Sequence, residues 1–471
     1  MKCKESSYIR ENKPLFRKLL DELLKTYEYA SVLVNDSVGR NYSVSKTGAN
    51  VGENSIYTAK GFVVKVYEGG CYAEYSGNEI SQEKVPEIVN FIAKELVPMG
   101  EKMDKSHYPV PVDEKVSFIK STDYEIDPIE MGDEAILAKL TEVHKKGMAY
   151  DERVLNCSAA CQFQKYSKLF LSANKDLEQN VMWATASLMV DVKRGEEVKY
   201  YYTTASNLGG LEILDKIIKK VDDAAHVAIE LLDSEPIKPG EYECVCDPAT
   251  TGMIVHEAFG HGVEMDMFVK DRALAKKYVG EYVASPLVNM HDGNAEAQTA
   301  TYFFDDEGTL SHDTLVIDKG ILKAGISDLQ SAMALGSEPT GNGRRESYKR
   351  KAYTRMTNTY FEPGTDKVED MIASIKDGFL LENPESGMED PKNWGIQCMV
   401  NIAREIKDGK LTGKIFSPIV LTGYVPDLLK SISMMSDEKR LDGAGMCGKG
   451  YKEWVKVSDG GPYIKARIRL G

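Results

Sequence analysis

Hydrophobic positions near the start of the chain follow a helical period. Apolar and aromatic residues recur every three or four positions between Leu15 and Tyr27, and Pro14 stands directly before them. Proline is tolerated in the first turn of a helix, where its missing N–H has no bond to lose. The pattern therefore predicts a helix that begins near Pro14 and buries one face.

Apolar and polar positions alternate in several later segments, which is the pattern of half-buried strands. Glu68-Gly69-Gly70 joins two of these segments as a hairpin would. The predicted strands lie at residues 30–34, 62–67, 71–75, 155–171 and 181–204, the last one interrupted at residues 193–197. Helical periods also return, and they predict helices at residues 86–97, 134–144 and 211–232.

A stretch punctuated by Pro236, Pro239 and Gly240 follows the last of these helices and indicates a domain boundary. We predict an N-terminal domain of residues 1–236, with helices on an antiparallel sheet. Residues 237–471 are expected to form a mostly antiparallel β domain of short strands and long loops. The fold class is therefore predicted to be α+β.

Length and composition agree with two folded domains. The 471 residues exceed the size at which one hydrophobic core stops growing, and 42% of them are hydrophobic and 28% charged. The chain has 59 Lys and Arg residues against 73 Asp and Glu residues, a net charge of −14. Because this charge repels phosphate backbones, we expect no nucleic-acid partner.

Apolar runs long enough to span a membrane are missing from the sequence, and no leader-like stretch follows Met1. The eight cysteines are scattered over the chain rather than packed as in a small disulfide scaffold. We therefore predict a cytoplasmic protein without a membrane span, in which most cysteines are reduced thiols.

One predicted helix holds the residues that point to chemistry. It follows a strand at residues 242–246, with Asp247 as the N-cap and Pro248 in the first turn. Its sequence HEAFGH (256–261) places Glu257 between two histidines. Zinc hydrolases use such an arrangement, in which imidazoles hold the metal and the carboxylate activates water.

The spacing of the two histidines is unusual for such a site. His256 and His261 are five positions apart, so a regular helix would point them roughly 140° from each other. Either the helix widens locally into a π-type turn, or it breaks at Gly260. Without one of these changes, both histidines would be ordinary helix residues.

A catalytic zinc site needs a third protein ligand, and Cys447 is the best candidate. It lies in the glycine-rich segment GAGMCGKG (443–450), where the backbone can approach closely. A thiolate is an acceptable partner for two imidazoles. Glu264, three positions after His261, is a further ligand candidate or a carboxylate that orients a ligand.

Two alternatives to a zinc peptidase remain open from these residues. Cys447 is also a candidate nucleophile, activated by one of the histidines. Such a thiol enzyme would survive removal of metal and be inactivated by alkylation, whereas a metalloenzyme would lose activity with its metal. The second alternative is a non-catalytic scaffold or companion subunit. The complete set of candidate metal-binding residues argues against it.

Four motifs, taken in order, resemble those of the TldD/PmbA family, once described as modulators of DNA gyrase. They are HEAFGHGVE (256–264), FDDEGT (304–309), RMTNTY (355–360) and the CGK loop (447–449), followed by a closing GGPY (460–463). The similarity is firm over the C-terminal half. The N-terminal half matches only in its coarse arrangement of helices and strands.

The resemblance implies a metallopeptidase that cuts small or unfolded peptides, with Zn²⁺ on His256, His261 and Cys447 and with Glu257 as general base. It also implies a two-fold dimer, either a homodimer or a heterodimer with a family companion that lacks the metal motif.

Substrate contacts are less defined by the sequence. We expect the peptide to be held as an added strand along a sheet edge, because main-chain pairing ignores side-chain identity, but the sequence does not identify the edge. Arg344 and Arg345 are candidates to clamp a peptide carboxylate or the oxyanion.

Overall fold

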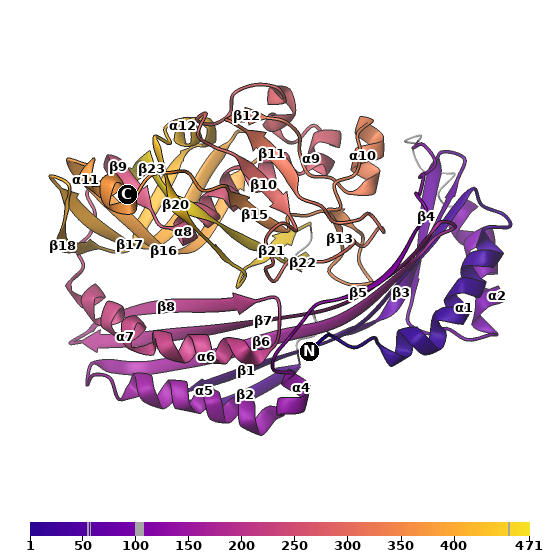
Figure 1. The fold of residues 1–471 in the computed structure, drawn as a ribbon, viewed down its shortest axis with the longest axis horizontal. Coiled ribbons are helices and arrows are strands. Elements are labelled where there is room, and N and C mark those ends of the chain that lie inside the picture. Colours follow the sequence, from indigo (N-terminus) through magenta and orange to yellow (C-terminus); the bar gives the residue numbers. More distant parts are fainter. Residues whose placement is uncertain (54–55, 57, 99–107, 451–452) are drawn as a thin grey trace.

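The computed structural model describes residues 1–53, 56, 58–98, 108–450 and 453–471. Two large sheets dominate it (Figure 1), and the first has eight strands in the described part of the chain. Its main order is β4-β3-β1-β6-β7-β5, with β2 beside β1 and β8 beside β7. These strands are β1 (Tyr29–Ser45), β2 (Gly48–Glu53), β3 (Ala59–Glu68), β4 (Cys71–Gly77), β5 (Val116–Ser121), β6 (Val154–Leu171), β7 (Lys175–Arg194) and β8 (Glu197–Asn207).

Three long antiparallel strands, β1, β6 and β7, run through the whole first sheet. Helices cover it at both ends (Figure 1), and each group closes its own apolar core. At one end lie α1 (Ser7–Leu23), α2 (Lys84–Phe91) and the π-helical η1 (Ile92–Leu96). At the other lie α4 (Pro128–Met131), α5 (Asp133–Met148), η2 (Leu211–Ile213), α6 (Leu214–Ile217), η3 (Ile218–Lys220), α7 (Val221–Glu230) and η4 (Leu231–Asp233).

The second sheet lies across the opposite side of the long strands from α5, α6 and α7 (Figure 1) and has eleven strands among the described residues. Its main order is β12-β11-β10-β15-β23-β19-β17-β16-β9, and β9 also pairs with β23. These strands are β9 (Gly240–Cys246), β10 (Met290–Gly293), β11 (Thr314–Asp318), β12 (Ile321–Leu322), β15 (Asn358–Phe361), β16 (Asp377–Asp390), β17 (Gly395–Lys407), β18 (Lys410–Phe416), β19 (Ile419–Tyr424), β20 (Met434–Asp442) and β23 (Ser458–Leu470).

Short helices and two small hairpins complete the C-terminal part. The hairpins are β13 (Gly343–Arg344) with β14 (Tyr353–Thr354), and β21 (Met446–Lys449) with β22 (Glu453–Lys456). The helical segments are α8 (Pro248–Ile254), η5 (Val255–Gly260), η6 (His261–Val263), α9 (Met265–Val269), η7 (Leu274–Tyr278), α10 (Leu329–Leu335), α11 (Val368–Ala373) and α12 (Val425–Lys430).

Charged side chains join the first sheet to loops of the C-terminal part in a buried region. Lys65 of β3 lies 2.5 Å from Glu307 and 3.4 Å from Glu74, and Arg345 pairs with Glu74 at 2.5 Å. Phe304 packs against apolar side chains of the first sheet in the same region. The Asp-Asp-Glu motif thus contributes to the contact between the first sheet and the C-terminal part, because Glu307 is one of its acidic residues.

Most predicted elements are confirmed, and the fold is a mixed α and β structure with a β-rich C-terminal part. One expectation was wrong in detail. The first helix begins at Ser7 rather than near Pro14, because the Ser6 hydroxyl caps it by accepting from the N–H of Ile9, so Pro14 lies inside the helix. The expectation of mostly short C-terminal strands is confirmed: β16, β17 and β23 have 13 or 14 residues, but the other described strands of this part have nine or fewer.

The predicted helix at 211–232 forms as a run of α-helical turns, α6 and α7, separated by the tighter 3₁₀ turn η3. None of the described helices is both long and apolar enough to cross a bilayer. All strands of the first sheet precede residue 237, and all strands of the second sheet follow it. A division into domains between residues 236 and 237 is our proposal from this distribution.

Candidate metal centre

The histidine-bearing helix starts from a central strand. β9 is bracketed by β16 on one side and β23 on the other, and it runs directly into Asp247. The Asp247 carboxylate accepts the N–H of Thr250 at 2.8 Å, and Pro248 occupies the first turn of α8. The predicted strand, cap and helix are therefore confirmed, and they fix where the helix enters the site.

The helix widens at the two histidines. Residues 255–260 form a π-helical turn, and the N–H of His261 donates to the carbonyl of His256, five positions earlier. The extra residue per turn brings positions i and i+5 onto one side of the helix. Of the two arrangements that the sequence left open, the structure has the π-type turn, and the imidazole centroids lie 5.1 Å apart.

Gly260 is needed for space and not for a break in the helix. Its backbone is helical, with φ −61° and ψ −55°. A Cβ atom at this position would clash with the sulfur of Met356, which is fully buried. Gly387 of β16 plays a similar part opposite Glu257, whose Cγ lies where a side chain at position 387 would begin.

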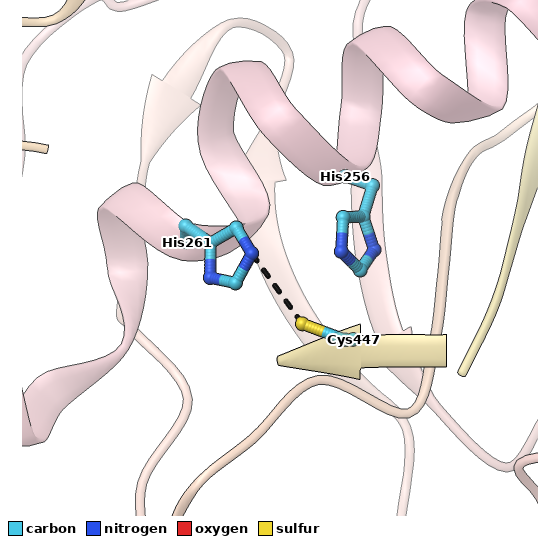
Figure 2. A group of neighbouring side chains, drawn as sticks. All are labelled: His256, His261 and Cys447. Carbon is cyan, nitrogen blue, oxygen red and sulfur yellow. Dashed lines mark hydrogen bonds between the residues drawn. The ribbon is translucent and has the colours of Figure 1, made fainter. Parts of the chain in front are cut away.

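Cys447 approaches the two histidines from a separate hairpin. It lies on β21, and its thiol points toward the imidazoles above it (Figure 2). Its Sγ is 3.4 Å from Nε2 of His261, and one ligand atom from each of the three residues lies within 4.8 Å of the others. Sulfur and nitrogen ligands on a tetrahedral zinc are about 3.5 Å apart, so this separation suits the ion.

Glu264 orients the second histidine. One of its carboxylate oxygens lies 3.2 Å from Nδ1 of His261, which directs Nε2 toward Cys447. Burial alone would raise the pKa of Glu264, but Lys449 and His261 outweigh it and lower the pKa to about 2. A carboxylate that fixes the tautomer and ring orientation of a metal-binding histidine is the usual partner of such a ligand.

The electrostatics of the three residues suit a cation. Burial would raise the pKa of the Cys447 thiol, but His261 and His256 outweigh it and hold the pKa well below its ordinary value. Thiolate is the form of cysteine that binds metals. Nδ1 of His256 is buried and has no hydrogen-bond partner in the described part of the chain. Two imidazoles, one of them with an unpartnered buried nitrogen, and a thiolate together fit a zinc ion.

Three further residues near the ligands were not identified from the sequence. Lys449 and Arg355 lie within motifs that carried the family resemblance, so a signal for them existed. Glu389 had none. It lies on β16 on the same face as Gly387, and both of its carboxylate oxygens are buried without a hydrogen-bond partner among the described residues. Burial, together with Glu264 and Glu257, raises the pKa of Glu389 to about 9.

The candidate ligands open into a large cavity between the two sheets. Its volume is about 1540 Å³, above the roughly 300–1,000 Å³ of sites for small ligands. His256, Glu257, His261 and Cys447 contribute to its wall. The edge strand β8 and the bulged part of β16 contribute to the same wall.

Arg344 and Arg345 lie outside the wall of this cavity. Arg345 is buried and holds Glu74 through two hydrogen bonds of 2.5 and 3.0 Å, an arrangement that fixes the sheet interface. Arg344 donates to the carbonyl of Met356 at 2.6 Å and lies over the ring of Tyr302. The structure therefore does not bring either arginine together with the candidate metal ligands.

The closing glycines of the GGPY motif let the histidine-bearing helix pack on β23. A Cβ atom at Gly252 of α8 would lie 2.7 Å from the backbone nitrogen of Gly460. A Cβ atom at Gly461 would lie 2.8 Å from the methyl group of Thr251. Because glycines stand on both the helix and the strand at this contact, the helix packs close to β23. This close packing determines how far the histidines are placed from the strand.

Comparisons with known proteins point to one group. Residues 239–468 match the family model described as the PmbA/TldA metallopeptidase C-terminal domain. A metalloprotease of Methanocaldococcus jannaschii is 25% identical over 452 residues, which cover 95% of this chain and 97% of the relative. A metalloprotease TldD homolog of Haemophilus influenzae is 30% identical over 352 residues, or 72% of each chain.

Solved structures share the whole fold. A modulator of a DNA gyrase from Thermotoga maritima superposes with a TM-score of 0.78 at 17% identity, covering 97% of this chain and 100% of that one. TldE from Thermococcus kodakarensis has a TM-score of 0.75 at 17% identity, covering 96% and 99%. At this identity the similarity concerns the fold alone.

Proposed function

The chain belongs to the PmbA/TldD family of metallopeptidases, and on this premise we propose that it is a zinc peptidase acting on small or unfolded peptides. The observation that carries the proposal is the convergence of His256, His261 and Cys447 at a π-helical turn. Two imidazoles and a thiolate leave a fourth position free on a tetrahedral zinc.

Zinc bound by three protein ligands supplies Lewis acidity to a carbonyl and lowers the pKa of water toward about 7. Glu257 is the proposed general base. It lies one position after His256, and it contributes to the wall of the cavity beside the candidate ligands. Its carboxylate takes a proton from the attacking water and returns it to the leaving amine as the C–N bond breaks.

An unfolded peptide suits the cavity because of its size and its edge strand. In the described part of the chain, β8 pairs only with β7, and residues 201–206 of β8 line the cavity. Three of its carbonyls are engaged, because those of Tyr200, Tyr202 and Thr204 accept hydrogen bonds from the side chains of Asn401, Asn383 and Lys220. A peptide pairing with this edge would therefore bond mainly to its N–H groups.

We extend the proposal to assembly and location. A two-fold dimer, either of this chain or with a metal-free companion, is supported by the fold that it shares with TldE. Mass measurement by light scattering, alone and with a co-expressed companion, distinguishes these assemblies from a monomer. A cytoplasmic location remains our proposal from the scattered, unpaired cysteines.

Metal content and peptidase activity test the central proposal together. We expect about one zinc per chain in the wild type by elemental analysis, hydrolysis of an unstructured peptide, and loss of both in Cys447→Ser. Activity that survives chelation and is blocked by alkylation would instead establish Cys447 as a nucleophile. A protein with neither zinc nor activity would fit the companion subunit.

A further inference from the structure

The candidate ligands come from two segments that are far apart in the chain. His256 and His261 lie on the helix that follows β9, whereas Cys447 lies on the hairpin of β21 and β22. Sγ of Cys447 and Nε2 of His261 belong to residues 186 positions apart. Some contact other than a metal ion must hold the hairpin against the helix if the ligands are arranged before the ion binds.

Lys449 makes that contact from the hairpin side. Its side chain is only 12% exposed, and its Nζ donates to Glu264 at 3.0 Å, to Asp266 at 2.6 Å and to the carbonyl of Thr354 at 3.0 Å. An ammonium group has three hydrogens, so its donor capacity is fully used within the protein. Lys449 is therefore a fixed link and not a side chain free to bind substrate.

The carboxylate that Lys449 holds is the one that orients His261. Oε2 of Glu264 receives Lys449 and lies 3.2 Å from Nδ1 of His261. Glu264 is 2% exposed, and a buried carboxylate without a cation is strongly destabilising. Lys449 thus holds the Glu264 carboxylate in place, and Glu264 in turn keeps Nε2 of His261 directed at Cys447.

Arg355 reinforces the same arrangement from a third segment. Its guanidinium is buried and donates to the carbonyl of Cys447 at 2.6 Å and to that of Glu453 at 3.1 Å. These carbonyls belong to the two strands of the hairpin, so Arg355 clamps both of them. Its Nε lies 4.0 Å from the second oxygen of Glu264, which places the hairpin clamp beside the carboxylate that orients the histidine.

We infer that Lys449 is a positioning residue for the metal centre: through Glu264 it links the hairpin that carries Cys447 to the helix that carries His261, and so preorganises the ligands for zinc. The inference rests on the proposed function only in taking His256, His261 and Cys447 as the zinc ligands. It concerns affinity for the ion and is independent of whether peptides are hydrolysed.

Zinc affinity of the full chain, measured by competition with a chromophoric chelator, tests the inference. Lys449→Met and Glu264→Gln should each weaken zinc binding roughly 10- to 100-fold. If Lys449 acts through Glu264, the double variant should be little worse than the weaker-binding single variant. Lys270→Met is the matched control, because Lys270 pairs with Asp266 at 3.2 Å, as Lys449 does, but is 47% exposed and forms no ion pair with Glu264 in the described part of the chain. Its loss should change affinity less than threefold.

Cobalt(II) substitution provides a readout of ligand geometry. In Lys449→Met the thiolate-to-cobalt absorption should weaken or shift relative to the wild type, while Lys270→Met should reproduce the wild-type spectrum. Lys449→Gln, which keeps a donor but removes the charge, serves if the methionine variant does not fold.

Several outcomes would overturn the inference. Unchanged zinc affinity in a folded Lys449 variant would do so, and so would additive losses in the double variant. A wild type that binds no zinc would overturn both the inference and the proposed function, whereas tight zinc binding that is insensitive to Lys449 would overturn only the inference.

Discussion

The backbone N–H of His261 donates to the carbonyl of His256, five residues back instead of the four of an α-helix. This single shift in register turns two imidazoles that would diverge by about 140° into neighbours on one side of the helix. The thiol of Cys447 then lies within reach of both imidazoles, because all three ligand atoms fall within 4.8 Å of one another.

Packing at Gly260 should control this turn. Gly260→Ala adds a methyl group where Met356 Sδ lies, although alanine suits the helical backbone there. We expect the substitution to lower the free energy of unfolding by about 1–3 kcal/mol and to weaken zinc binding. Urea denaturation and metal competition measure the two effects. Adding Met356→Ala should restore part of the zinc affinity, and equal affinities in all three proteins would contradict the steric explanation.

Replacing the proposed base should separate metal binding from turnover. Glu257→Gln keeps the shape of the side chain but removes the proton acceptor, so zinc content should stay near one per chain while kcat falls roughly 10²- to 10⁴-fold. Elemental analysis and a peptidase assay on the same preparation measure both quantities. Glu385→Gln is a suitable control, because Glu385 also contributes to the cavity wall and bonds the Tyr200 hydroxyl. Near-normal turnover in Glu257→Gln would remove Glu257 from the mechanism.

Glu389 should make the metal-free protein less stable as the pH rises. Its pKa is raised from 4.5 to about 9 by burial and by neighbouring carboxylates, so between these values the folded chain holds one proton more than the unfolded chain. Stability from this group is fully present below pH 4.5 and is lost at up to about 1.4 kcal/mol per pH unit as the pH rises toward 9.

Glu389→Gln removes that dependence. In denaturant unfolding of the chelator-treated protein, the variant should gain stability over the wild type at pH 8 and much less at pH 5. The same gain at both pH values would show that Glu389 does not hold a proton in the folded state.

Arg345 should matter for stability and not for substrate affinity. Arg345→Met leaves Glu74 without its bidentate partner in a buried region, which should lower the free energy of unfolding by about 3–5 kcal/mol. Arg350→Met, which removes a half-exposed guanidinium 3.8 Å from Glu346, should cost no more than about 1 kcal/mol. Thermal unfolding compares the two variants. A raised KM in folded Arg345→Met, without loss of stability, would instead support the carboxylate clamp.

The fold class and many element positions could be predicted from local patterns. Alternating apolar residues located β6 and β7, and Asp247 with Pro248 located the start of the histidine-bearing helix. Pro14 led to a predicted helix start that was too late. The true start is capped by Ser6, which precedes the apolar repeat on which the prediction was based.

The sequence by itself determined which residue types could form the site: two histidines around a glutamate, a cysteine in a glycine-rich loop, and Glu264 one turn after His261. Only the tertiary structure decided that the helix widens rather than breaks, because the choice depends on how Met356 and β16 pack against it. The same holds for Lys449, Arg345 and Glu389. The partners of Lys449 and Arg345 are distant in sequence, and Glu389 is buried without a hydrogen-bond partner among the described residues. Such pairing and burial follow from the assembled fold and not from local pattern.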